Sequence, residues 1–425
     1  MATREIAVYD DSLSQRFRII GVPYSNQYYT YSMEKLERLR PCFFPLIESR
    51  WRDTIIDTTD SVPKPGRYVY VPSIKDAKGD CVIIGTLYKD MKLRPSPLEE
   101  YSEELKLRQP MKAKYTSPDD RLFIEDQSIR VAIRGSILDP QRLVTGLVIC
   151  LKGRINDQGE FECEDYMHPG PPLMCLEPRS EEKYVAFVSG LDLGGQTTSR
   201  SALLLLRDFI FGSTPLSELS RKVVRLVIAG NGIGKCDVSA LSQCDVYFAQ
   251  LAGSIPVDLM PGNDDPSNRN IPQQPIHPTF LEHSSRYSSF QSTTNPYAFS
   301  VDGIRFLGTS SQAVRGICEY SHLNELGMLR DSNLTFLEAL RLTASARFIA
   351  PTAPDTLGCH PEAAVLHLTE DNEFPHVMFS GNSHEYATST MDGLPRLICV
   401  PAFSKQPCVI LVSLSTLEPR LIRFE

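Results

Sequence analysis

The alternation of apolar and polar positions divides the chain into three stretches with different expected structures. In the first stretch, residues 26–51 carry apolar side chains at roughly helical spacing, which predicts a helix that Pro41 ends or kinks. Residues 1–25 show no such pattern, and we expect them to be loosely held. The helix would use its apolar stripe to pack on the next domain, or, in a second interpretation, to bind a partner. The stripe consists of Tyr28, Tyr31, Met33, Leu36 and Leu39.

The second stretch is rich in short segments of β type. Residues 61–73 contain three prolines and predict a linker. Five strands with glycines at the bends follow, a pattern that is typical of a small closed barrel of the OB type. Residues 89–120 would form an insertion between the first two barrel strands. The predicted strands are residues 81–88, 122–126, 129–135, 143–153 and 161–166.

The third stretch begins after the Pro-Gly-Pro-Pro sequence at residues 169–172. Short apolar strands alternate there with helical segments, which predicts a layered α/β domain with a largely buried sheet. The expected organisation is an N-terminal segment with a helix (1–60), an OB-fold domain (61–175) and an α/β domain (176–425). The predicted strands are 184–189, 223–229, 255–260, 304–307, 347–349, 376–379, 397–400 and 408–414, and the predicted helices are 199–211, 238–252 and 334–343.

Composition narrows the classes of function. The net charge of −8 and the pI of about 5.6 give no overall positive field for nucleic acid, although a local basic patch stays open. The 11 cysteines are odd in number and include no Cys-x-x-Cys pair, which favours reduced thiols over disulfides or zinc. We find neither an apolar signal core nor an apolar run of about 18 residues, so we expect no membrane segment.

Glycines and polar residues follow four of the predicted strands, where function gathers in α/β sheets. Their order resembles that of calcineurin-type metallophosphoesterases, whose active members end these strands in Asp-x-His, Gly-Asp, Gly-Asn-His and Gly-His-x-His. The resemblance implies an α/β sandwich that lacks most of its metal ligands. The corresponding segments here are Gly190-x-Asp192, Gly230-Asn231, Gly262-Asn263-Asp264 and Gly381-Asn382-x-His384.

Substitutions at five of these positions remove the expected metal chemistry. A two-metal phosphoesterase needs carboxylates and imidazoles around two ions about 3.5–4 Å apart. Asn231 stands where an Asp would bridge the ions, and its neutral amide cannot offset their charge. Gly190 offers no side chain, and Asp264, in place of a His, would repel a substrate phosphate. Asp192 and Asn382 also replace histidines.

The remaining positions give little support for catalysis. Only Asn263 and His384 match the active pattern, and a lone His384 is more simply explained as a histidine hydrogen-bonded within a loop. Asp265 and the neighbouring aspartates fit turn and cap chemistry at strand ends. His360 could lie near the same loops, but its spacing is weak support. We therefore predict no catalytic, cofactor-binding or metal-binding residue, and no cofactor.

Several longer blocks of sequence are more specific than these short motifs. They are residues 143–146, 188–191, 257–268 (with Met260-Pro-Gly-Asn-Asp-Asp-Pro266), 272–278, 294–297, 302–310 and 350–359. These blocks resemble the B-subunit family of replicative DNA polymerases, in particular its delta branch, over about residues 20–425. The resemblance implies an OB-type barrel domain joined to an inactivated calcineurin-like phosphoesterase domain, with no enzymatic activity.

The same resemblance implies partners and a location. Such subunits bind the C-terminal metal-binding domain of the catalytic subunit of DNA polymerase delta and, on another surface, a third subunit. That third subunit contacts the sliding clamp, so clamp and DNA would be reached indirectly, in the nucleus. Archaeal relatives keep the metal ligands and act as nucleases; the five substitutions here argue against that activity. The chain also looks shorter than some relatives after Asn231.

Three functions stay open at this point. The first is a scaffold that ties a catalytic subunit to an accessory subunit. The second is single-strand DNA binding by the barrel, although its strands carry few aromatic residues. The third function is a weak Mn²⁺-dependent phosphodiesterase built from Asp192, Asn231, Asn263, Asp264 and His384.

The long excursion over residues 271–297 has two interpretations. It either docks a partner or packs as a loop of its own domain.

Overall fold

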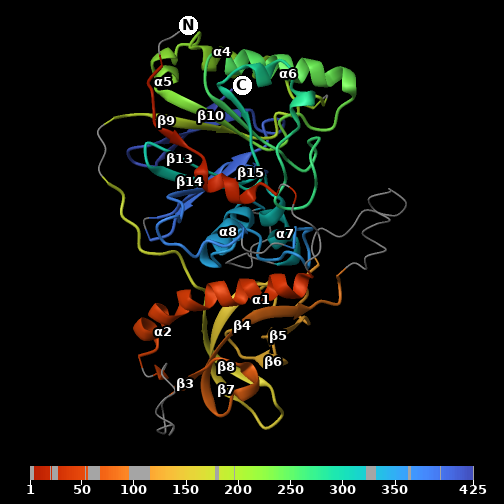
Figure 1. The fold of residues 1–425 in the computed structure, drawn as a ribbon, viewed down its shortest axis with the longest axis vertical. Coiled ribbons are helices and arrows are strands. Elements are labelled where there is room, and N and C mark those ends of the chain that lie inside the picture. Colours follow the sequence, from red (N-terminus) through yellow and green to blue (C-terminus); the bar gives the residue numbers. More distant parts are fainter. Residues whose placement is uncertain are drawn as a thin grey trace.

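The computed structural model describes residues 4–19, 21, 27–52, 54–55, 68–94, 115–177, 181–195, 197–321, 332–361, 365–392 and 394–424. The molecule is elongated, with a β-barrel at one end and a larger region of two sheets and flanking helices at the other (Figure 1). Helix α1 (Tyr28–Leu39) lies across the barrel, on the side that faces the two sheets (Figure 1).

The N-terminal residues are more firmly held than their sequence suggested. Strand β1 (Tyr9–Asp10) pairs antiparallel with β13 (Tyr297–Val301) at the edge of one sheet. The 3₁₀ helix η1 (Ser12–Phe17) follows and buries Phe17 completely. The expectation of loose residues is therefore wrong for residues 4–19, because pairing and burial fix them.

The predicted helix over residues 26–51 is confirmed from α1 onward. It continues as the 3₁₀ helix η2 (Arg40–Phe43) and as α2 (Phe44–Arg50). Pro41 lies in the first turn of η2, where its missing N–H leaves few backbone hydrogen bonds unmade. The proline therefore tightens the helix locally instead of ending it.

The barrel is a seven-stranded sheet in the order β2-β3-β4-β5-β6-β8-β7, closed by antiparallel pairing of β4 with β7. All five predicted strands are present. The prediction missed β2 and β3, and β3 occupies the end of the stretch expected to be a linker; residues 61–67 lie outside the described part. The elements are β2 (Thr54–Ile55), β3 (Tyr68–Val71), η3 (Ile74–Asp76), β4 (Asp80–Asp90), β5 (Arg121–Glu125), β6 (Arg130–Arg134), β7 (Val148–Ile155) and β8 (Phe161–Met167).

The larger region contains two six-stranded sheets. One has the order β1-β13-β14-β15-β17-β16, and the other β12-β11-β10-β9-β18-β19. Within the second sheet, β9 to β12 run parallel, as expected for alternating strands and helices. The further strands are β9 (Tyr184–Val188), β10 (Val223–Ala229), β11 (Val257–Met260), β12 (Phe290–Ser292), β14 (Ile304–Thr309), β15 (Val377–Ser383), β16 (Ala387–Thr390), β17 (Arg396–Pro401), β18 (Cys408–Ser413) and β19 (Pro419–Arg423).

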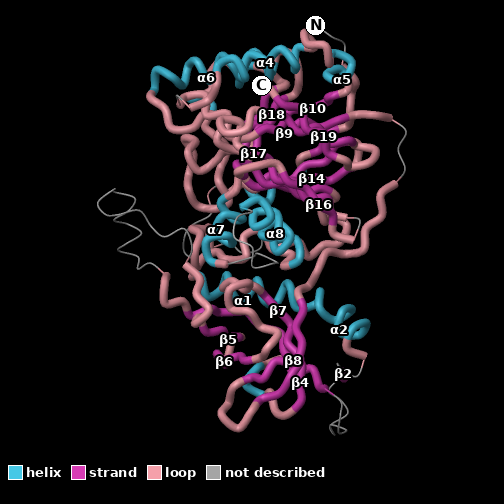
Figure 2. The backbone as a smooth tube through the Cα atoms, turned by 180° about the vertical axis from the view of Figure 1, so that it is seen from behind, coloured by secondary structure: helices cyan, strands magenta, loops and turns pink. Residues whose placement is uncertain are grey.

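Helices cover the outer face of each sheet, which makes a four-layered α/β sandwich. Figure 2 shows α4 and α6 outside one sheet, and α7 and α8 between the other sheet and α1. No helix among the described residues is long and apolar enough to cross a membrane. The helices of this region are α4 (Arg200–Phe211), α5 (Ser217–Arg221), η4 (Pro278–Phe280), η5 (Ser284–Arg286), α6 (Val238–Ala252), α7 (Gln312–Tyr320) and α8 (Ser332–Ser345).

The space between the two sheets is filled by aromatic side chains. Phe187 of β9 lies 4.7 Å from Phe379 of β15, measured between ring centroids. Phe299 and Phe306 of the neighbouring strands stack at 4.9 Å. All four side chains are buried, so the inner faces of the sheets form one dry core.

A second core runs without interruption from the barrel through α1 to α7 and α8. Within it, the buried Lys35 of α1 donates a hydrogen bond to the Pro351 carbonyl at 2.8 Å and lies over the Phe348 ring. Burial lowers the pKa of Lys35 to about 7. Lys89 of β4 donates to the Tyr320 carbonyl at the end of α7. Barrel and sandwich are therefore joined by packing and by hydrogen bonds.

Two predictions about irregular segments have different outcomes. The predicted strand over residues 347–349 is wrong, since only Phe348 pairs, in an isolated bridge with His367. In the excursion over residues 271–297, Gln273 pairs with Asn295, and both side chains are buried. These contacts favour a loop packed on its own domain.

Candidate functional site at the strand ends

The carboxyl ends of β9, β10, β11 and β15 meet at one open cavity of about 370 Å³. Asp192, Asn231 and Asn382 have left-handed backbone there, with φ of 45°, 51° and 53°. Asx residues tolerate this conformation better than other L-residues, which explains why they stand at these sharp turns. The cavity brings together five of the motif positions: Gly190, Asp192, Asn231, Asp264 and Asn382.

Gly190 leaves no room for the carboxylate that a metal site would need at its position. Its φ is 58°, and an added Cβ would lie 2.8 Å from both Asn382 Oδ1 and the Ala402 Cβ. Real Cβ atoms essentially never approach so closely. The space that a first metal ligand would fill is therefore occupied by neighbouring side chains.

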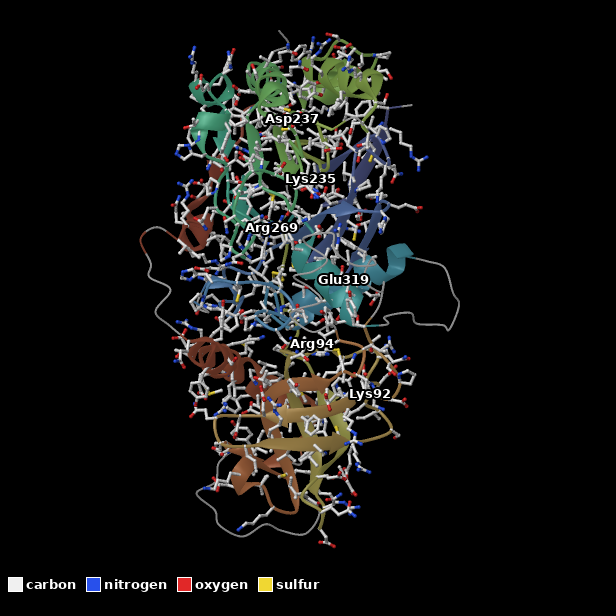
Figure 3. The ribbon with its side chains drawn as sticks, turned by 90° about the vertical axis from the view of Figure 1, so that its right-hand side faces the viewer. Lys92, Arg94, Lys235, Asp237, Arg269 and Glu319 are labelled. Carbon is white, nitrogen blue, oxygen red and sulfur yellow. The ribbon has the colours of Figure 1, made fainter. Side chains whose placement is uncertain are left out.

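Asn231 and Asp264 bind each other across the pocket. The Asn231 amide donates to Asp264 Oδ2 at 3.3 Å, and the Asp264 backbone N–H donates to Asn231 Oδ1 at 3.1 Å. Lys235 Nζ lies 3.2 Å from the other Asp264 oxygen. An ammonium group thus lies beside this carboxylate. Figure 3 shows Lys235 on the two-sheet part of the molecule, away from Lys92 and Arg94, which lie nearer the barrel.

Lysine also occupies the surroundings of the one retained histidine. Lys405 Nζ lies 3.3 Å from His384 Nδ1. Partial burial, followed by the charges of Lys405 and Arg315, lowers the pKa of His384 below its ordinary value of 6.5. His384 is therefore neutral at pH 7 and accepts a hydrogen bond from the lysine.

The other candidates have structural surroundings. Asp265 is buried and accepts hydrogen bonds from the backbone N–H groups of Gly232, Ile233, Gly234 and Gly262. Burial raises its pKa in spite of these four donors. The prediction of cap chemistry is confirmed for this residue.

Asn263 and His360 take no part in lining the pocket. The Asn263 side chain is exposed to solvent. His360 is buried elsewhere, and its backbone N–H donates to the Ile271 carbonyl. The suggestion that His360 lies near the strand-end loops is therefore wrong for the lining of this pocket.

The remaining motif aspartate is held by a hydroxyl. Thr197 Oγ1 donates to Asp192 Oδ2 at 2.6 Å. No group of three or more His, Cys, Asp or Glu side chains within the described ranges lies close enough to hold a metal ion. Because the retained polar groups face lysines and a threonine, these residues do not fit a two-metal centre.

Sequence reasoning missed the cations of this pocket. Lys235, Arg315 and Lys405 all line it, from a loop after β10, from α7 and from a loop after β17. They are scattered over some 170 residues and belong to no motif. Only Lys235 carried a local signal, since it follows Asn231 by four positions.

An OB-type barrel packed on a two-sheet sandwich with phosphoesterase-like strand ends defines the class of the protein. A family model described as the DNA polymerase delta subunit OB-fold domain matches residues 27–166. A second family model, which describes the B-subunits of DNA polymerases alpha and epsilon, matches residues 185–389. Both models agree with the fold class expected from the sequence.

Curated relatives specify the family further. The DNA polymerase delta small subunit of Oryza sativa is 34% identical over 97% of this chain and 96% of its own length. The Arabidopsis thaliana small subunit is 38% identical over 81% of this chain and 82% of its own length. DNA polymerase delta subunit 2 of Drosophila melanogaster is 32% identical over 97% of both chains. The chain therefore belongs to the family of DNA polymerase delta small subunits, as its sequence blocks predicted.

One solved structure shows a distant similarity to this chain. It is the purple acid phosphatase PPD1 from yellow lupin, with 12% identity, a TM-score of 0.31, and coverage of 65% of this chain and 57% of that one. A similarity at this level carries no conclusion about activity.

Proposed function

We propose that this chain is a non-catalytic accessory subunit of DNA polymerase delta. In this role it bridges the C-terminal metal-binding domain of the catalytic subunit and a third subunit that contacts the sliding clamp. Family membership supports the accessory role. The observation that carries the absence of catalysis is the pairing of Asp264 with Lys235 and of His384 with Lys405, which puts ammonium groups beside the retained polar residues.

We also propose domain boundaries and a cellular location for the protein. The three units are residues 1–60, 61–175 and 176–425, and none of their residues is catalytic or binds a cofactor or metal. The complex acts in DNA replication and repair in the nucleus, reaches the clamp through the third subunit and touches DNA at most indirectly.

Exposed apolar side chains support a protein-binding role. Tyr28 and Tyr29 at the start of α1 are exposed, as are Leu204 and Leu205 in the middle of α4. Protein-binding surfaces are built from such side chains where they form a contiguous patch. The two sets lie at different places along the molecule, which suits two separate partners (Figure 1).

The barrel offers little for single-stranded DNA. The guanidinium of Arg130 covers the Tyr88 ring at 3.8 Å and pairs with Glu125 at 2.6 Å. A base stacking on Tyr88 would first have to displace this cation, at the cost of an ion pair. The surroundings of this aromatic side chain therefore disfavour DNA binding as the principal function.

Co-expression tests the bridging role. The full chain is produced with the C-terminal domain of a polymerase delta catalytic subunit and the N-terminal domain of a third subunit, and the products are analysed by size-exclusion chromatography with light scattering. We expect one stable complex that contains a single copy of each protein. Elution of this chain alone, with the other two absent from its peak, would contradict the proposal.

A further inference from the structure

Two of the three cations in the strand-end pocket have no acidic partner among the described residues. Lys235 is offset by Asp264 at 3.2 Å. Neither Arg315 nor Lys405 forms an ion pair with a carboxylate of the described part of the chain, although both line the cavity. Asp192 and Asp264 line the same pocket, so its three cations and two carboxylates leave a net charge of +1, which attracts anions.

Other groups around these cations strengthen the attraction for an anion. The nine-residue helix α7 begins next to the pocket, and its Ser311 N-cap forms no side-chain cap hydrogen bond. The positive end of the helix dipole thus adds to the charge of Arg315 in its first turn.

An unpaired acceptor inside the pocket points to a ligand that also donates. Asn382 uses its amide nitrogen to donate to the Ser310 carbonyl at 3.0 Å and to the Ala229 carbonyl at 3.4 Å. Its Oδ1 has no hydrogen-bond partner within the described ranges, and the residue is only 9% exposed. A buried acceptor without a partner calls for an explanation, and one that belongs to a residue lining a cavity can be satisfied by a bound molecule.

We propose that this pocket binds the phosphate group of a nucleotide without any metal ion. Arg315 and Lys405, which both line the cavity, hold the phosphate oxygens. A hydroxyl of the phosphate monoester or of its sugar donates to Asn382 Oδ1. The volume of about 370 Å³ is within the range of small-molecule sites and leaves room for more than the phosphate. The site only binds, and this proposal does not depend on the bridging role.

Calorimetric titration of the full chain tests the site. Deoxyadenosine monophosphate and inorganic phosphate serve as separate probes, in excess EDTA. We expect the nucleotide to bind more tightly than phosphate, and Arg315→Gln with Lys405→Gln to weaken its affinity about a hundredfold, since each lost charge-assisted hydrogen bond is worth about tenfold. The matched control is Lys75→Gln with Lys78→Gln, which removes two exposed charges on the barrel and leaves affinity unchanged.

A second variant predicts a change of opposite sign. Asp192→Asn keeps an acceptor for Thr197 and removes a negative charge from the pocket, so it should tighten nucleotide binding roughly threefold. Equal weakening by the pocket and control variants, binding that EDTA abolishes, or no binding at millimolar nucleotide would overturn the proposal. So would binding of a single-stranded oligonucleotide without binding of the mononucleotide, which would indicate a nucleic-acid surface instead.

Discussion

The space between the two sheets and the pocket at their strand ends share strands β9 and β15. The first is apolar and closed to water, and the second is polar and open. Between the sheets, Phe187, Phe299, Phe306 and Phe379 are buried and in contact. The pocket is polar, open to water and filled by residues from distant loops. The sheets are held by apolar contacts, whereas at the strand ends Asp264 and His384 lie beside lysines.

This difference shows that the fold does not depend on metal chemistry at the strand ends. Aromatic burial is worth several kcal/mol per side chain, whereas the exposed ion pairs of the pocket contribute little to stability. We therefore expect the two-sheet fold to tolerate changes at its strand ends as long as the core between the sheets is intact.

The largest loss of stability is expected from a substitution that opens a cavity in the core between the sheets. Phe187→Ala removes a fully buried ring that contacts Phe306 and Phe379, so we expect a loss of about 3–5 kcal/mol in the free energy of unfolding. Urea unfolding followed by circular dichroism measures it. The matched control is Phe280→Ala, whose ring is exposed and should cost less than about 1 kcal/mol. Equal losses in the two variants would contradict the dominance of this core.

A smaller effect is expected where the core meets the pocket. Asp265→Ala leaves four buried N–H groups without their acceptor and should cost about 3 kcal/mol. The neighbouring Asp264→Ala removes a partly exposed carboxylate and should cost less than about 1 kcal/mol. Thermal unfolding of both variants measures the two losses. A larger loss of stability in Asp264→Ala than in Asp265→Ala would contradict the structural role of Asp265.

The pH dependence of stability probes a charge buried at the rim of the core. Burial raises the pKa of Asp258 from 3.8 to about 6, against the attraction of Arg225 and a hydrogen bond from Tyr297. The folded state then binds the proton more tightly than the unfolded state, so this group stabilises the fold fully below pH 4. The stabilisation, about 3 kcal/mol for this shift, is lost as pH rises from 4 to 6.

Comparison with a non-titrating variant isolates this contribution. Asp258→Asn cannot ionise, so the difference in unfolding free energy between wild type and variant should shift between pH 4 and pH 6 and stay constant above it. Urea unfolding at half-unit pH intervals measures the difference. A difference that is independent of pH over this range would contradict the raised pKa.

The smallest effect is expected inside the pocket itself. Lys405→Gln removes an exposed charge whose partner is the neutral His384, so the free energy of unfolding should change by less than about 0.5 kcal/mol. The pKa of His384 should rise toward its ordinary value, because a neighbouring positive charge is lost. NMR titration of the histidine ring measures this shift, and an unchanged pKa would show that Lys405 does not act on it.

Much of this architecture could be predicted from periodicity, for physical reasons that differ among elements. The barrel strand 148–155 begins with four buried apolar residues, and the sheet strand 223–229 is apolar except for Arg225, so burial favours one arrangement of each. The two-residue strands β1 and β2 have no periodic signal, because they exist only through pairing with distant strands. The prediction of a strand at 347–349 failed because Arg347 has left-handed backbone, with φ of 48°, although Phe348 and Ile349 are apolar and buried.

The pocket was only half predictable from the sequence. Its glycines and Asx residues stand in fixed order after apolar strands, since sharp left-handed turns require them. The cations that face them come from loops and a helix far along the chain, and only tertiary structure brings Arg315 and Lys405 to His384. The sequence therefore revealed which ligands are missing and left open which groups replace them.

Under our proposal the two-sheet region has no phosphoesterase activity of its own. The most direct test is a phosphodiesterase assay of the full chain with a chromogenic phosphodiester in millimolar Mn²⁺, with His384→Ala as the comparison. We predict that wild type and variant both give the rate of the buffer. Hydrolysis by the wild type that requires Mn²⁺ and disappears in His384→Ala would contradict the account.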